Sequence, residues 1–76
     1  MMLYLKIQKI MREKNIRQVD ILETMDIEQS RLSAIIRGKE LKNISLRTIL
    51  GITKALNVDI YELIEGTEYD EENTDL

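Results

Sequence analysis

The chain has 76 residues, which suffices for one domain with a single hydrophobic core. It contains no cysteine and no histidine, which excludes disulfides, thiolate chemistry, the usual zinc ligand sets, imidazole catalysis and the serine triad. The net charge of −3 is distributed unevenly along the chain. Residues 1–64 hold all 11 Lys and Arg against eight acids, a charge of +3, whereas residues 65–76 hold six acids and no base. We therefore expect a mildly basic globular part and a strongly acidic tail.

Hydropathy and the distribution of acids exclude further classes of protein. No apolar run approaches the roughly 20 residues of a membrane span, and Lys6, Gln8 and Lys9 interrupt the apolar start of the chain, unlike a signal peptide. We expect a soluble, cytoplasmic protein. The carboxylates are scattered without a base or a metal-ligand set, so the sequence predicts no enzyme, no catalytic residue, no metal and no cofactor.

The first predicted helix runs from Leu3 to Lys14. Its apolar residues recur at helical spacing, and polar residues occupy the other face. The inward positions are Leu3, Ile7, Ile10 and Met11. Asn15 is expected to end the helix in the left-handed conformation, because Asn tolerates a positive φ better than any other residue except glycine.

Two short helices separated by a tight turn follow in the segment from Ile16 to Lys39. The first is predicted from Gln18 to Met25 and the second from Gln29 to Arg37, with Asp26 in the turn at positive φ. The inward positions of the pair are Ile21, Leu22, Met25, Leu32, Ile35 and Ile36. This spacing predicts a DNA-binding helix-turn-helix.

The outer face of the Gln29–Arg37 helix carries small or polar side chains at intervals of three and four. These are Gln29, Ser30, Ser33, Ala34 and Arg37. Such a face is narrow enough to enter a major groove, where Gln and Ser hydrogen-bond to base edges and Ala contacts a thymine methyl. Gly38 is expected to close the helix as its left-handed cap.

Two more helices complete the predicted domain. Ser45 is expected to cap a helix from Leu46 to Leu56 that ends at Asn57. Its apolar stripe is Leu46, Ile49, Leu50, Thr53 and Leu56. Gly51 interrupts this helix, and close packing is one explanation. Asp59 and Glu62 have capping-box spacing before a last helix from Ile60 to Ile64, which Gly66 stops. We expect an all-α domain over residues 1–66 and a disordered tail over residues 67–76.

This series of residues resembles the lambda-repressor-like helix-turn-helix family, also called the Xre or Cro/CI type. The matching positions are Gln18, Leu32, Ile35, Arg37-Gly38-Lys39, Ile44-Ser45-Leu46, Ala55-Leu56-Asn57-Val58 and Tyr61-Glu62-Leu63. The resemblance implies a compact five-helix fold. The chain departs from the family at Arg17, where a capping Ser or Thr is common, so the second helix lacks the expected side-chain cap.

The resemblance also implies roles for individual residues. Gln29, Ser30, Ser33 and Ala34 are expected to face DNA bases, whereas the residues expected to contact phosphates are Arg17, Gln18, Arg37, Lys39, Lys42 and Asn43. Relatives often pair through the last helix, which implies a homodimer interface at Tyr61, Leu63 and Ile64. A dimer suits DNA reading, because two helices related by a two-fold axis read half-sites about 34 Å apart.

Each of these features also has an ordinary explanation. Lys6, Lys9, Arg12 and Lys54 are typical of a solvated face, and Gln29 and Ser30 could be mere helix-start residues. The apolar residues of the last helix could finish the core. The acidic tail either solubilises the domain or competes with DNA for its basic face.

The sequence thus predicts a DNA-binding transcriptional regulator, a repressor or autoregulator, that binds double-stranded operator DNA as a homodimer. The alternative is a protein-interaction module on the same scaffold, such as an antitoxin whose main partner is a toxin. Glu28 and the weak net charge favour the alternative, whereas Gln18, Arg37 and Lys39 favour DNA.

Overall fold

The computed structural model describes residues 1–39 and 44–70, and these residues form five α-helices and no strand. The helices are α1 (Leu3–Lys14), α2 (Gln18–Thr24), α3 (Gln29–Ile36), α4 (Leu46–Leu56) and α5 (Ile60–Ile64). The predicted all-α class is confirmed. Three helices have the predicted bounds, whereas α2 and α3 end one residue earlier than expected.

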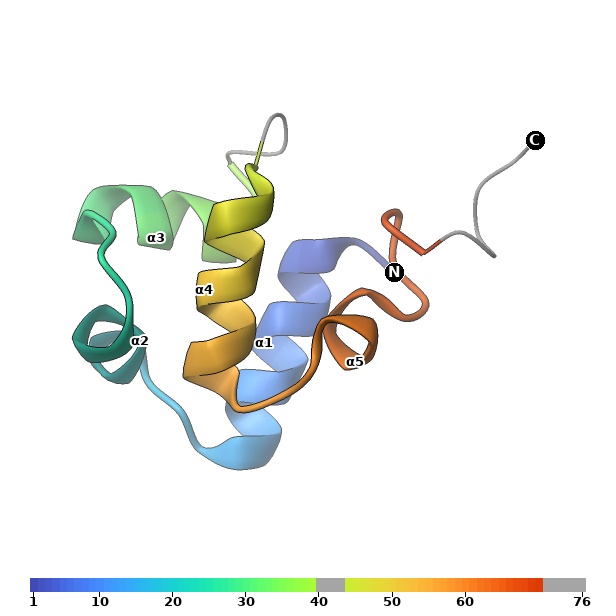
Figure 1. The fold of residues 1–76 in the computed structure, drawn as a ribbon, viewed down its shortest axis with the longest axis horizontal. Coiled ribbons are helices and arrows are strands. Elements are labelled where there is room, and N and C mark those ends of the chain that lie inside the picture. Colours follow the sequence, from blue (N-terminus) through green and yellow to red (C-terminus); the bar gives the residue numbers. More distant parts are fainter. Residues whose placement is uncertain (40–43, 71–76) are drawn as a thin grey trace.

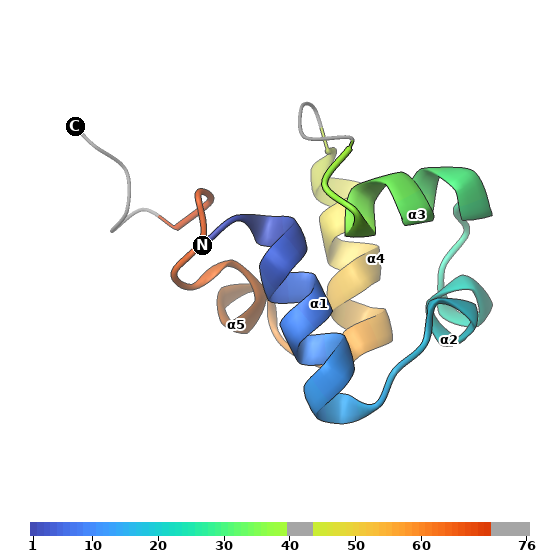
Figure 2. The ribbon, with the colours of Figure 1, turned by 180° about the vertical axis from the view of Figure 1, so that it is seen from behind.

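Helices α1 and α4 lie at the centre of the domain, with α2 and α3 on one side and α5 on the other (Figure 1, Figure 2). Helix α2 packs on α4, α3 packs on α1, and α5 contacts both central helices. Helix α3 thereby lies at the periphery of the domain with one face inward and the opposite face in solvent.

The core is built from the apolar stripes of all five helices. Its buried side chains are Leu3, Ile7, Ile10, Ile21, Leu32, Ile35, Ile36, Ile49, Ile52, Leu56 and Leu63. Helix α4 differs from the expected pattern, because Leu46 and Leu50 are 63% and 45% exposed while Ile52 is buried. At 3.6 residues per turn, Ile49, Ile52 and Leu56 define the centre of the stripe, and Leu46 and Leu50 lie beyond its edge.

The helix ends follow the expected chemistry with one exception. Asn15 and Asn57 both end their helices at a φ of 57°, and Gly38 follows α3 at 75°. Asp26 does not have positive φ, so that prediction is wrong. The reason lies one residue earlier: Met25 ends α2 in an extended conformation, with φ −127° and ψ 154°.

Two glycines lie where another side chain would collide. A Cβ on Gly38 would lie 2.8 Å from the Tyr4 ring, and a Cβ on Gly51 would lie 2.7 Å from the Met25 methyl carbon. Met25, which follows α2, thus packs closely on Gly51 of α4, and a Cβ there would require the flexible end of the Met25 side chain to move. The glycine lowers helix propensity at this position by about 1 kcal/mol relative to Ala.

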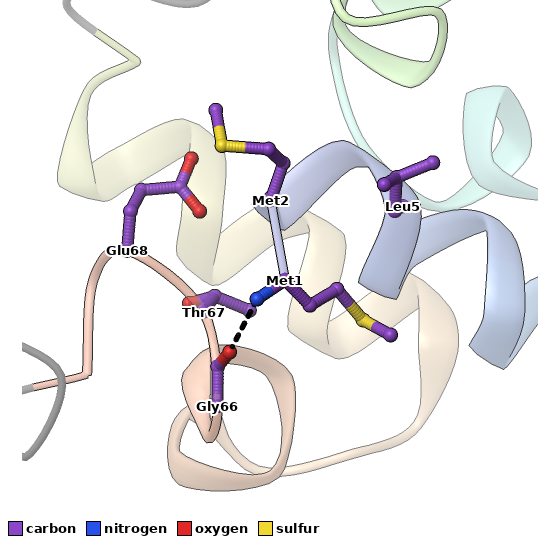
Figure 3. A pocket seen from close by; sticks show the side chains of 6 residues that line it. All are labelled: Met1, Met2, Leu5, Gly66, Thr67 and Glu68. Atoms are coloured by element: carbon purple, nitrogen blue, oxygen red, sulfur yellow. Dashed lines mark hydrogen bonds between the residues drawn. The ribbon is translucent and has the colours of Figure 1, made fainter.

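Residues 66–70 form a turn that contacts the start of α1 (Figure 3). The Leu3 N–H donates to the Glu68 carboxylate at 2.6 Å, the Met1 amino group donates to the Gly66 carbonyl at 3.0 Å, and Thr67 is only 1% exposed. We expected nothing from residue 67 onward to pack. That is wrong for residues 67–70, because hydrogen bonds replace the apolar contacts that the segment lacks. Residues 71–76 lie outside the described residues, and the domain boundary stays a prediction.

The three residues of α5 that were predicted to form a dimer interface differ in their burial. Leu63 is completely buried among the core residues, so it is unavailable to a second copy of the folded chain and that prediction is wrong. Ile64 is half-buried, and Tyr61 is 53% exposed. Their burial differs because α5 is short and buries only one of its side chains completely.

Candidate nucleic-acid interface

The outer face of α3 presents polar side chains to solvent. Gln29 and Ser30 are exposed, and neither side chain has a hydrogen-bond partner within residues 1–39 and 44–70. Leu32, Ile35 and Ile36 hold the opposite face of the helix in the core. The packing fixes the rotation of α3, so Gln29 and Ser30 point outward together, as expected for residues that face DNA bases.

Ser33 and Ala34, further along the same helix, are half-buried rather than exposed. The Ser33 hydroxyl donates to Gln18 Oε1 at 2.8 Å, which joins α3 to the start of α2. The structure therefore brings a predicted base-facing residue and a predicted phosphate-contacting residue into direct contact. Sequence spacing did not show this contact, because it depends on the angle between the two helices.

The end of α3 carries two exposed cations. Arg37 lies on the outer side, with its Nε donating to the Ser33 carbonyl at 3.4 Å, and Lys39 follows Gly38. The backbone N–H of Lys39 donates to the Ala34 carbonyl at 2.8 Å, which closes the helix over the left-handed Gly38. This closure holds both cations beside the polar face. Lys42 and Asn43, also expected at phosphates, lie outside the described residues.

Arg17 and Asp20 form one half of a capping box at the start of α2. The Arg17 side chain cannot accept a bond, but the Asp20 carboxylate accepts the Arg17 backbone N–H at 2.8 Å and the guanidinium at 3.4 Å. These bonds lower the pKa of Asp20, the backbone bond most. The Arg17 side chain remains 76% exposed. It is therefore accessible to a phosphate at the edge of the polar face.

A family model described as a Cro/C1-type helix-turn-helix DNA-binding domain matches residues 6–68. The chain belongs to this family. Membership confirms the resemblance seen at Gln18, the Arg37-Gly38-Lys39 ending and the last two helices, and the model covers α2 to α5 and most of α1. No curated protein matches the chain.

The Cro/C1-type domain has two further cations near the motif that sequence reasoning did not single out. Arg31 of α3 and Arg47 of α4 line one polar depression together with Asp26, Ser45 and Thr48. Arg31 lies in the first turn of the second helix of the motif and Arg47 in the first turn of the helix that follows it, and these positions are the signal that could have identified them. They extend the basic character of the domain from α3 towards the start of α4.

The described part of the Cro/C1-type domain holds neither a metal-ligand cluster nor a membrane-spanning helix. Within residues 1–39 and 44–70, no group of three or more acidic side chains is placed to hold a metal ion. Across the same ranges, every helix is too short or too polar to cross a membrane. The candidate site is the polar face of α3 with its flanking cations, which lies within the helix-turn-helix DNA-binding domain that the family model matches.

Proposed function

We propose that this protein is a sequence-specific DNA-binding transcriptional regulator, a repressor or autoregulator, that reads operator half-sites with α3. The observation that carries the proposal is the outer face of α3. There Gln29 and Ser30 are exposed at the start of α3 and the cations Arg37 and Lys39 are exposed at its end, while the inner face fixes the helix in the core.

The two kinds of side chain have different tasks on DNA. Arg37 and Lys39 neutralise phosphates, which contributes affinity for any sequence and makes binding depend steeply on salt. Gln29 and Ser30 hydrogen-bond to base edges, and each good base contact discriminates between sequences by about 1 to 3 kcal/mol. Ala34 lies on the same side of α3, where its methyl group suits a thymine methyl.

We propose further that the regulator acts as a homodimer through α5. Ile60 and Tyr61 are exposed large apolar side chains at the start of α5, and Ile64 is half-buried. Sedimentation of the protein with and without the change Tyr61→Glu tests this. We expect a dimer that the change converts to a folded monomer, whereas a wild-type monomer at concentrations that saturate DNA contradicts the proposal.

A protein-interaction module on the same scaffold is the second candidate, and exposed apolar residues of α4 favour it. Leu46 and Leu50 lie one turn apart on this helix and are 63% and 45% exposed. A partner protein such as a toxin could cover them. This candidate predicts that changes at the α3 face leave partner binding intact.

The test of DNA binding begins with selection of duplexes from a random-sequence pool by the wild-type protein. The double change Arg37→Ala, Lys39→Ala is then titrated on the selected duplex and on a scrambled duplex. At about 1 kcal/mol per phosphate contact we expect roughly thirtyfold weaker binding to both. The slope of the logarithm of the binding constant against the logarithm of the salt concentration should become less steep by about two.

The matched control for this test is the double change Lys9→Ala, Arg12→Ala on α1. It removes the same charges from exposed positions outside the motif and should alter affinity less than about twofold, apart from screened long-range attraction. Equal losses for the two double variants would show that net charge rather than the α3 face binds DNA. Absence of any enriched duplex would reject the proposed function.

A further inference from the structure

One hydrogen bond joins the two helices of the motif between the predicted base contacts and the predicted phosphate contacts. The Ser33 hydroxyl on α3 donates to Oε1 of Gln18, the first residue of α2, at 2.8 Å. Both side chains are half-buried. The bond therefore lies at the edge of the polar face and links residues that are 15 positions apart in the chain.

This bond uses the only proton of the Ser33 hydroxyl. A serine hydroxyl has one donor and two acceptor lone pairs, so Ser33 cannot donate to a base while it donates to Gln18. Gln29 and Ser30 have no such intramolecular partner among the described residues. On α3, the side chains of Gln29 and Ser30 are thus available to hydrogen-bond to bases. The hydroxyl proton of Ser33 is instead used in the bond to Gln18 of α2.

The same bond determines which atoms Gln18 presents to solvent. With Oε1 held towards α3, the Nε2 group occupies the other side of the amide. No described residue accepts a bond from Nε2, and every buried side-chain nitrogen or oxygen in the described ranges has a partner, so Nε2 is accessible to solvent. Its two N–H groups are donors that suit the oxygens of a phosphate.

We propose that Ser33 is a positioning residue, which orients the Gln18 amide so that Nε2 donates to a DNA phosphate, and that Ser33 does not read bases. This inference rests on the proposed function and refines it. Ser33 acts through Gln18, so its contribution to affinity is independent of DNA sequence and disappears when Gln18 is removed.

The test is a double-mutant cycle on the pool-selected duplex. The variants are Ser33→Ala, Gln18→Ala and the two changes together, and Ser30→Ala is the matched control on the same helix. Alanine has the highest helix propensity, so α2 and α3 should persist in all of these variants, and thermal melts verify folding. Each variant is also used to select duplexes anew from the random pool, which reports its base preference.

We expect Gln18→Ala to weaken binding about tenfold and Ser33→Ala about fivefold, as for loss of one charged and one neutral hydrogen bond. The double variant should bind within twofold of Gln18→Ala. Ser33→Ala should enrich the same bases as the wild type. Ser30→Ala should change the enriched bases. When it is combined with Gln18→Ala, the loss of affinity should be the product of the two single losses.

Two results overturn the inference while leaving the proposed function intact. One is a double variant whose loss is the product of the single losses, about fiftyfold. The other is a changed base preference in Ser33→Ala. If the wild type enriches no duplex, the proposed function and the inference fail together.

The orientation of Gln18 is tested without DNA by its side-chain amide signals in an NMR spectrum of the free protein. Loss of the bond in Ser33→Ala should shift both N–H signals of Nε2 towards those of a freely rotating glutamine. Ser30→Ala should leave them in place. Unchanged Gln18 signals in Ser33→Ala overturn the inference.

Discussion

The two sides of the domain use polar side chains in opposite ways. At the turn of residues 66–70, Glu68 bonds to the Leu3 backbone, and Asp70 accepts the Gly66 N–H at 2.8 Å. On the outer face of α3, Gln29 and Ser30 have no partner within the described ranges. The polar groups of the turn bond within the fold, whereas Gln29 and Ser30 of the α3 face remain available to a ligand, as the proposed function requires. Such a difference is expected between a binding face and a structural one in a domain where both are polar.

Helix α1 connects the two sides. Its start is capped by Glu68, its Tyr4 ring lies against Gly38, and its Gln8 side chain donates to the Ile36 carbonyl at 2.7 Å. The last two contacts hold the C-terminal end of α3 from behind. Gln29 and Ser30 on the outer face of α3 can therefore remain without internal hydrogen bonds, because the contacts on the inner side hold the helix in place.

The largest effect is expected when a substitution on the inner face of α3 is compared with one on its outer face. Leu32→Ala removes a completely buried side chain, and we expect it to lower the free energy of unfolding by about 3 kcal/mol. Gln29→Ala should change it by less than about 0.5 kcal/mol and weaken DNA binding instead. Urea unfolding measures both. A similar loss of stability in the two variants would show that the outer face also supports the fold.

The next effect compares the left-handed glycines of the two sides. Gly38 and Gly66 have φ values of 75° and 77°, but a Cβ meets the Tyr4 ring only at Gly38 and meets nothing within 4 Å at Gly66. We expect Gly66→Ala to cost about 1 kcal/mol and Gly38→Ala about 2 kcal/mol or more, measured by urea unfolding. Equal costs would show that the contact with Tyr4 does not add to the destabilisation at Gly38.

A smaller effect tests the turn alone. Glu68→Ala removes the cap of α1 and should lower the free energy of unfolding by about 1 kcal/mol, with DNA affinity unchanged. Glu65→Ala is the control, because Glu65 accepts the Lys6 ammonium through its backbone carbonyl at 2.7 Å and keeps that bond. Reduced DNA affinity in Glu68→Ala would show that the two sides are coupled through α1.

The smallest effect is a pH dependence at the start of α2. The pKa of Asp20 is lowered in the folded state, so its contribution to stability is present above about pH 4, the pKa of an unfolded aspartate, and is lost as pH falls through the folded pKa. Asp20→Asn should therefore be less stable than wild type at pH 7 and equally stable in strong acid. A difference that grows on acidification contradicts this assignment.

The fold was predictable where local chemistry decides it. Apolar spacing gave the helices, and Asn15, Asn57, Ser45 and Asp59 ended or began them as expected, with the Ser45 hydroxyl accepting the Thr48 N–H at 3.1 Å. Contacts between distant segments were not predictable. The Glu68 cap lies 65 positions from Leu3, and no pattern in a single sequence pairs them.

The candidate site was predictable as a face but not as a set of roles. Spacing on α3 placed Gln29 and Ser30 together in solvent, as found. The commitment of Ser33 to Gln18 depends on the crossing of α2 and α3, which side-chain volumes set and sequence spacing does not. The sequence left Leu63 open between the core and a dimer interface for a similar reason, since α5 is too short to show an apolar stripe, and the structure places Leu63 in the core.

The most direct test of the central claim is NMR mapping of the pool-selected duplex onto the protein. The backbone amide signals of the wild-type protein are followed during titration with the duplex and with a scrambled duplex at equal salt. We predict that the selected duplex shifts signals at the start of α2, along α3 and at Lys39, while signals of residues 66–70 stay in place. Shifts concentrated at residues 66–70 or on α5, with α3 unaffected, would contradict the account.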